Sequence, residues 1–419
     1  MTFKILTIVL ALAAIMPMQG ADPMATTYTY TQCEGSLMPY PVERKTIAYP
    51  DTLTPVLINH VGRHGARYPS SSQNCQTLKS ALEKAQSSGT ITPLGTSLLR
   101  TINDVITVCD GRWGALDSLG EYEQRVLASK MYTAFKPAFD SGKVNAISSY
   151  SPRAMMSMYS FTHQLDRLNN KLEFQTSTGR QNSELMRPFD LDETFKEYIQ
   201  SAVLADTYQD YFKKNCPVSA IERVLGKDYP YQDADQKQSL AYAEYHILAG
   251  LSAMSYEGCD ISEFFTVDEI NALWACFNLR QYLQRSSNTL SSTPADIAGP
   301  LLENLIQITD DYIDGRTSTS VWLRFGHAET LLPLLSLMRL PGCYYMTNYF
   351  DTVAKNWKDF DIVPMAANLH MILFKHTKSG KYFVRIDLNE TPVSFIPGTD
   401  AIYIPWLTAK KYLMRCLPY

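Results

Sequence analysis

Three segments of the sequence share one layout. In each, an apolar run with strand character precedes ionisable residues, and a helical pattern comes next. The strands are expected at 54–61, 144–151 and 320–326. In open α/β sheets, ligands bind beyond the carboxyl ends of the strands, so side chains far apart in the sequence can meet in one cleft. The layout therefore predicts an α/β sheet with a ligand site at one edge.

The rest of the chain divides into two kinds of sequence. Helical spacing is expected at 75–87, 94–109 and 119–135, and a strand pair around a Lys-Ser-Gly turn at 370–390. From about residue 190 to residue 313 the pattern is nearly all helical, which is typical of an insertion. We therefore predict an α/β domain formed by 21–165 together with 314–419, and a mainly α-helical domain at 166–313.

The net charge of the chain limits the classes of ligand that it can bind. The chain has a formal net charge of -4, with 45% hydrophobic and 19% charged residues, as expected of a folded protein. A weakly acidic chain gives no support to nucleic-acid binding, which we do not expect. An anionic ligand would need positive charge concentrated at one place.

The amino terminus predicts export. Lys4 precedes an apolar run from Ile5 to Ile15, and the small residues Gly20 and Ala21 follow it. This pattern indicates a secretory signal peptide at 1–20, and the run is too short to span a bilayer. A buried N-terminal helix is the alternative. We expect a periplasmic or secreted protein without a membrane span.

The eight cysteines all follow the expected cleavage point. An exported chain meets oxidising conditions, so we expect some of them to be paired. No Cys-x-x-Cys pair occurs, which removes the common zinc-ribbon and thioredoxin interpretations. Their connectivity stays open at this point.

The ionisable residues after the three strands suit a phosphate. Arginine presents a rigid fork that matches phosphate oxygens, and bidentate contacts of this kind are strong. The residues are Arg63, His64 and Arg67 after the first strand, Arg153 after the second, and His327 and Glu329 after the third. The sequence lacks a P-loop and an obvious cluster for two metals, so phosphoryl transfer would need a protein nucleophile. His64, between two arginines, fits that role.

The remaining histidines are interpreted as structural. His60 and His64 have the spacing of a helical metal pair, but Gly62 and Gly65 disfavour a helix there. We therefore predict no metal site and no cofactor. The other histidines without a recognisable setting are His163, His246, His370 and His376.

Three motifs resemble those of a known family. "RHGARYP" resembles the RHGxRxP signature of the histidine acid phosphatases, a branch of the histidine phosphatase superfamily. "RFGHAETLLPLL" resembles the His-Ala-Glu motif of the multiple inositol polyphosphate phosphatases, with Ala328 where other members of the branch carry Asp. "SPRAMMSM" resembles the Arg-x-x-x-Ser element, here Arg153 and Ser157. The motifs follow one another in the expected order.

The resemblance implies a fold and a mechanism. The fold would be a phosphoglycerate mutase-like central sheet flanked by helices, with an inserted α-helical domain that helps to bind substrate. His64 would attack phosphorus and form a phosphohistidine, and Glu329 would protonate the leaving oxygen and later assist water. The groups holding the phosphoryl oxygens would be Arg63, Arg67, Arg153 and His327. The implied substrates are inositol hexakisphosphate and lower inositol phosphates, handled by a monomer.

Two other functions stay open at this stage. One is a phosphoglycerate-type mutase, which the expected export disfavours because such substrates are cytosolic. The other is a secreted protein that captures phosphorylated ligands without turnover, which the presence of both His64 and Glu329 disfavours. The order in which ring phosphates would be removed does not follow from the motifs.

Overall fold

The structure is a computed structural model, and it describes residues 27–419. The expected signal peptide at 1–20 and the expected mature start at Ala21 lie outside these residues. Within 27–419, no helix combines the length and apolar character needed to cross a membrane.

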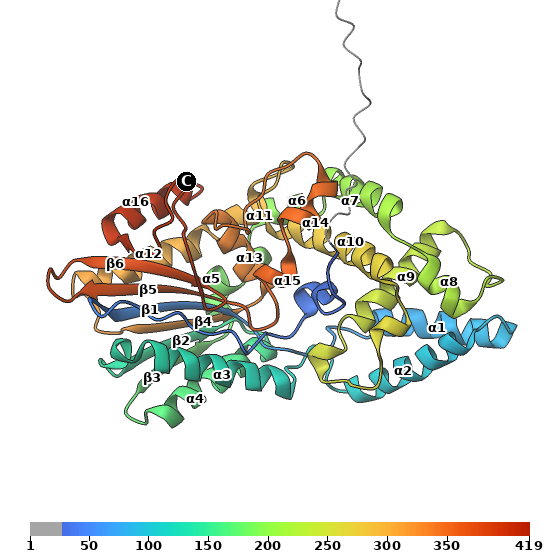
Figure 1. The fold of residues 1–419 in the computed structure, drawn as a ribbon, viewed down its shortest axis with the longest axis horizontal. Coiled ribbons are helices and arrows are strands. Elements are labelled where there is room, and N and C mark those ends of the chain that lie inside the picture. The colour runs from blue at the N-terminus through green and yellow to red at the C-terminus, as the bar shows by residue number, and fades with distance from the viewer. Residues whose placement is uncertain (1–26) are drawn as a thin grey trace, which may run out of the picture.

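A single mixed sheet forms the centre of one half of the molecule (Figure 1). Its strand order is β3-β2-β4-β1-β5-β6-β7, and β8 pairs with β6. The four strands from β3 to β1 run parallel, and β5 to β8 add antiparallel pairs. The strands are β1 (Leu53–Arg63), β2 (Lys143–Ser148), β3 (Glu173–Thr178), β4 (Val321–Gly326), β5 (Asn368–His376), β6 (Tyr382–Leu388), β7 (Thr391–Val393) and β8 (Ile404–Pro405).

Helices cover both faces of this sheet. Side chains alternate along a strand, so Leu57 and Val61 of β1 enter one core whereas Ile58 enters the other. The core containing Ile58 is closed by α3 (Ser118–Ala134) and α4 (Pro152–Leu168). The opposite core is closed by α12 (Gly299–Ile313), α13 (Ala328–Leu337) and α16 (Trp406–Cys416).

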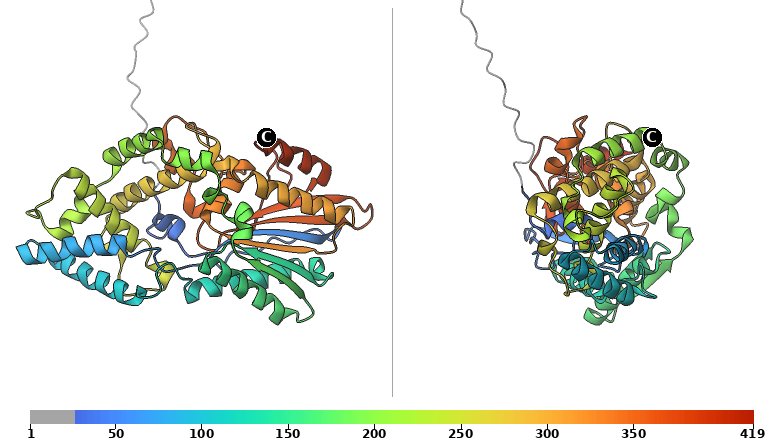
Figure 2. Two further views of the ribbon diagram at one scale, coloured as in Figure 1. Left: turned by 180° about the vertical axis from the view of Figure 1, so that it is seen from behind. Right: turned by 90° about the vertical axis from the view of Figure 1, so that its right-hand side faces the viewer.

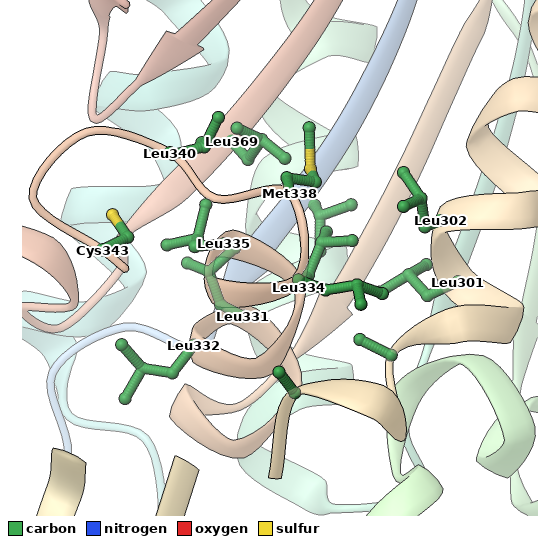
Figure 3. Close-up of a cluster of buried hydrophobic side chains, with 14 of the residues drawn as sticks. Leu301, Leu302, Leu331, Leu332, Leu334, Leu335, Met338, Leu340, Cys343 and Leu369 are labelled. Carbon is green, nitrogen blue, oxygen red and sulfur yellow. The ribbon is translucent and has the colours of Figure 1, made fainter. Parts of the chain in front are cut away.

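Helix α13 is the most deeply buried of the covering helices. Its leucines, among them Leu331, Leu334 and Leu335, belong to the same buried cluster as Leu301 and Leu302 of α12, and Leu334 points toward Leu301 (Figure 3). A helix that is apolar on all sides is stable only when it is surrounded by protein. Every residue of α13 is buried except Glu329, which lies in its first turn. The one partly exposed position of this helix is therefore a carboxylate.

A third core holds the helical end of the molecule together (Figure 2). It is formed by α1 (Gln73–Ser88), α2 (Pro93–Cys109), α8 (Ser219–Leu225), α9 (Ala234–Leu248) and α10 (Val267–Arg285). The shorter or peripheral helices are α5 (Ser183–Met186), α6 (Glu193–Ile199), α7 (Ala202–Asn215), α11 (Thr293–Asp296), α14 (Val353–Asn356) and α15 (Asp359–Ile362).

Some segments pack with a different domain from the one to which the predicted boundaries at residues 165 and 313 assign them. Helices α1 and α2 precede the predicted insertion but pack against α8 and α9. Conversely, β3 and α12 lie within 166–313 but belong to the sheet and its covering layer. We therefore propose a division by packing, in which the helical part contains α1, α2 and α8 to α10.

The eight cysteines, all within the described residues, are free thiols. The expected disulfides are therefore not found. All but Cys259 are buried, and most of them pack among apolar side chains as small hydrophobic residues do. Burial also raises the pKa of thiols such as Cys75, to about 11, which leaves them unreactive.

Candidate active site

The three motifs meet at one edge of the sheet. Strands β2, β4 and β1 are neighbours and run parallel. Arg63 at the end of β1 lies opposite Gly326 at the end of β4, and Ser148 at the end of β2 lies opposite Phe325. Because the strands end at the same level, the segments that follow them converge, as the sequence layout predicts.

Backbone contacts fix the loop that carries His64. Its N–H donates to the carbonyl of Gly326 over 3.1 Å, and its carbonyl accepts from Ala366 N–H over 2.9 Å. Gly65 is required by packing, because a Cβ there would lie 2.4 Å from the carbonyl oxygen of Gly120 in α3. The Gly65 N–H donates to Ser157 Oγ over 3.1 Å, which connects the first and second motifs.

His64 is prepared to act as a nucleophile. Its imidazole is 3% exposed, and Nδ1 lies 2.9 Å from the Gly65 carbonyl oxygen. A carbonyl only accepts, so Nδ1 carries the proton and Nε2 keeps its lone pair. Burial, together with the positive charges of Arg63 and Arg153, holds the pKa of His64 well below its usual value. The neutral ring is therefore the stable form near neutral pH.

Three arginines surround this imidazole and carry buried, unsatisfied donors: Arg63 is buried, whereas Arg67 and Arg153 are partly buried. Arg63 Nη1 donates to the carbonyls of Ser36 and Val363, both over 2.6 Å. The Nε atoms of Arg63, Arg67 and Arg153 are buried and have no hydrogen-bond partner among residues 27–419. Burial lowers the pKa of Arg63 to about 10 and the pKa of Arg67 to about 9. Buried cations with free donors fit an anion that supplies the missing oxygens.

A pocket of about 250 Å³ opens in front of His64. One wall comes from the sheet edge and includes all three arginines and Glu329. The opposite wall comes from α9 and α10, and its polar members are Tyr242, His246, Arg280, Gln281, Gln284 and Arg285. His246, interpreted from the sequence as structural, thus faces the site, and burial lowers its pKa to about 4.

His327 lies behind the pocket wall. Its ring is 5.5 Å from that of His64, centroid to centroid, and it is not among the described residues that line the pocket. Its Nε2 lies 2.8 Å from Ser149 Oγ and 3.1 Å from Arg187 Nη1. Because arginine can only donate, Nε2 accepts and the ring is neutral. Burial lowers the pKa of His327 to about 3, in agreement with that form.

Glu329 forms an ion pair across the pocket. Its Oε1 accepts from Arg285 Nη2 over 2.7 Å, and its side chain is 38% exposed. Burial alone would raise the pKa of this carboxyl, but the charge of Arg285 outweighs burial and holds the pKa well below its usual range. The carboxyl predicted to donate a proton is therefore ionised in the free protein.

No group of three or more His, Cys, Asp or Glu side chains within residues 27–419 is arranged to hold a metal ion.

The sequence matches the family model of the histidine phosphatase superfamily (branch 2) over residues 57–389. The chain belongs to this superfamily. The predicted membership is thereby confirmed, and the match includes all three motifs at the sheet edge.

Relatives within the superfamily carry more specific names. The chain is 25% identical to multiple inositol polyphosphate phosphatase 1 of Homo sapiens over 389 residues, covering 84% of this chain and 78% of the human protein. It is 23% identical to the protein of the same name from Gallus gallus, with 84% of this chain and 80% of that protein covered.

Solved structures share the fold. The multiple inositol polyphosphate phosphatase of Bifidobacterium longum, in complex with inositol hexasulfate, superimposes with a TM-score of 0.78 at 17% identity, covering 91% of this chain and 97% of that chain. The phytase from D. castellii gives a TM-score of 0.70 at 16% identity, covering 96% of this chain and 88% of that chain. The predicted fold class, a central sheet flanked by helices, is confirmed.

The structure brings together all six residues predicted from the motifs and adds others. Arg187 was missed, although it contacts His327 and is anchored by a salt bridge to Asp190 over 2.6 Å. Arg280 and Arg285 were also missed, because nothing in a helical pattern marks which turn faces a pocket. His60 lies in the sheet core, where its ring packs against Phe161 and Phe325, consistent with the structural role predicted for it.

Proposed function

We propose that this protein is a metal-independent phosphomonoester hydrolase that removes phosphates from inositol hexakisphosphate and lower inositol polyphosphates through a covalent phosphohistidine. One observation supports this proposal most directly. His64 is neutral and buried, with Nε2 free, beside arginines whose Nε donors have no partner among the described residues. That combination fits an enzyme that attacks a phosphate dianion better than a protein that only binds one.

The first half-reaction uses the sheet-edge residues. Arg63, Arg67 and Arg153 bind the phosphoryl oxygens and stabilise the charge that develops in the transition state. His64 Nε2 forms a bond to phosphorus while the bond to the ester oxygen breaks, and Glu329 supplies the proton that the departing alkoxide needs. His327, held by Ser149 and Arg187, places a neutral ring against that of His64 from behind the pocket wall and so helps to position the nucleophile.

The second half-reaction restores the enzyme. Glu329, now a carboxylate, takes a proton from a water molecule that attacks the phosphohistidine. The P–N bond breaks, phosphate leaves, and His64 returns to its neutral form. The same carboxyl group thus acts first as acid and then as base.

The pocket's charge supports a polyanionic substrate. Five arginines line it, and Glu329 is the single carboxylate among its described lining residues. Three of the arginines serve the phosphate under attack, whereas Arg280 and Arg285 lie on the opposite wall. An inositol ring that carries several phosphates could bring oxygens to both walls at once. The names of the relatives, multiple inositol polyphosphate phosphatase and phytase, support the same substrate class.

Chromatography of products over time tests this function. Inositol hexakisphosphate should disappear with the successive appearance of lower inositol phosphates, each step releasing one inorganic phosphate. A labelled phosphoenzyme, trapped by rapid denaturation, would separate an enzyme from a protein that only captures phosphorylated ligands. If the hexakisphosphate persisted while simple phosphomonoesters were hydrolysed, the substrate assignment would be wrong.

Activity is expected to survive exhaustive chelation. All groups that the proposed mechanism requires are side chains, so removing metal ions should leave the rate of phosphate release within about twofold. The measurement compares the activity of dialysed protein with and without a chelator. The substrate is p-nitrophenyl phosphate, because inositol hexakisphosphate would itself bind metal ions. A loss that zinc or magnesium restores would contradict the metal-independent mechanism.

We also propose that the protein is exported and acts as a monomer. The sequence at 1–20 supports export, because it has the charge and apolar pattern of a signal peptide. Protein recovered outside the cytoplasm should begin near Ala21 when its amino terminus is sequenced. Exported protein that still begins at Met1 would contradict this prediction.

A further inference from the structure

An ion pair joins the two walls of the pocket. Arg285 is the last residue of α10, which belongs to the helical part, and Glu329 lies in the first turn of α13 beside the sheet (Figure 1). The Nη2 to Oε1 distance of 2.7 Å is that of a charge-assisted hydrogen bond. The pair therefore lies in the same pocket as the arginines that surround His64.

Arg285 is placed so that it can bind a second anion. Its Nη1 donates to Gln281 Oε1 over 2.5 Å, which fixes the guanidinium from its own helix. Its Nε is buried and has no partner in the described part of the chain. The fork of an arginine binds carboxylate and phosphate by the same donors. A phosphate that enters the pocket therefore competes with Glu329 for Arg285.

The ion pair conflicts with the role of Glu329 as an acid. A carboxylate has no proton to give, and Arg285 keeps this group ionised in the free protein. Other positive or titratable groups also face Glu329, but it makes an ion pair only with Arg285 among the described residues. These other groups are Arg63 of β1, Arg67 in the loop after it, Arg153 of α4, Arg187 after α5, and His327 at the start of α13.

We propose that Arg285 is a positioning residue that exchanges partners. In the free protein it holds Glu329 as a carboxylate, and when a substrate phosphate enters, its donors turn to that phosphate and Glu329 takes up the proton that it later donates. The inference rests on the proposed function, because it assigns Glu329 the role of acid. With this exchange, Glu329 is protonated, and can act as an acid, only when substrate is bound.

The proton has a defined source and destination. A phosphate monoester loses its second proton near pH 6, so a substrate monoanion can carry that proton into the site. It passes from a phosphate oxygen to Glu329, and from Glu329 to the ester oxygen as the P–O bond breaks. After hydrolysis, Glu329 holds the proton taken from water. When phosphate leaves and Arg285 returns, that proton passes to solvent.

Titration of Glu329 in the intact protein tests the exchange without relying on turnover. Infrared difference spectra between wild type and Glu329→Gln isolate this carboxyl group across the pH range. In free wild type it should stay ionised at mildly acidic pH. Inositol hexasulfate is a polyanion that carries no titrating proton. Saturation with it should raise the pKa of Glu329 by roughly one to three units, the effect expected when a carboxylate loses one neighbouring positive charge. Arg285→Gln should show a similar shift without any ligand.

Arg280→Gln is the matched control. Arg280 lies in the same helix and lines the same pocket, but Glu329 is paired with Arg285. This variant should leave the titration of Glu329 within a few tenths of a unit of wild type. An unchanged titration in Arg285→Gln, or in wild type saturated with hexasulfate, would overturn the exchange.

Hydrolysis of p-nitrophenyl phosphate by wild type, measured alongside, separates the two proposals. Normal hydrolysis with an unmoved titration would refute the exchange alone. A titration that moves as expected in a protein without phosphatase activity would refute the proposed function instead.

Discussion

Replacing His64 by alanine is expected to abolish turnover and leave the fold intact. Without Nε2 no phosphoenzyme forms, and we expect kcat to fall on the scale seen when a serine protease loses its nucleophile, about 10⁶-fold. Among residues 27–419 the side chain makes one hydrogen bond, to the carbonyl of Gly65, and that segment is also held by backbone bonds to Gly326 and Ala366. Steady-state hydrolysis and circular dichroism of the purified variant would check both parts.

His246→Ala provides a comparison for this experiment. His246 lines the same pocket from the opposite wall and has no part in the proposed chemistry. It should still form a labelled phosphoenzyme, whereas His64→Ala should not. Near-normal hydrolysis by His64→Ala would show that another group attacks phosphorus.

Replacing Glu329 by glutamine is expected to separate substrates by their leaving groups. An inositol alkoxide leaves poorly and needs a proton as the P–O bond breaks, whereas a nitrophenolate needs little help. General acid catalysis contributes roughly 10²- to 10⁴-fold where it is needed. Hydrolysis of inositol hexakisphosphate should fall by that factor. Formation of the phosphoenzyme from p-nitrophenyl phosphate should change comparatively little.

Rapid-quench measurement of phosphoenzyme formation from both substrates would resolve these rates. The wild-type rate on inositol phosphates should also decrease as the pH rises above about 6, because fewer substrate phosphates then carry a proton. Arg285 lowers the pKa of Glu329 too far for ionisation of the free enzyme to cause this decrease. Equal decreases in the rates for both substrates would show that Glu329 has a binding or structural role and does not donate the proton.

The sequence predicts the sheet edge well because each motif follows a strand that is recognisable on its own. The strands expected at 54–61, 144–151 and 320–326 correspond to β1, β2 and β4. Strand β3 was missed. Its residues lie at the edge of the sheet and are mostly exposed or half-buried, so they lack the apolar run that marks a central strand.

The opposite wall of the pocket could not be predicted in the same way. Helix α10 is buried on several sides, so its polar residues follow no simple alternation with apolar ones. Which of them face His64 depends on how the helical part meets the sheet, a long-range contact that local sequence does not encode. The cysteines illustrate a different failure, because the expected export favoured disulfides whereas all eight cysteines, which lie within the described residues, are free thiols.

The arginines around His64 also affect how strongly the protein resists unfolding. Their Nε donors are buried and lack partners within residues 27–419, and such groups disfavour the folded state relative to an unfolded chain in water. An anion that satisfies them stabilises only the folded protein, by about 2.7 kcal/mol at a hundred times its dissociation constant. The phosphate released in the proposed reaction would be such an anion. The donors to which we assign the stabilisation of the transition state would then also make thermal stability depend on the phosphate concentration, and the protein would unfold most readily where its product is scarce.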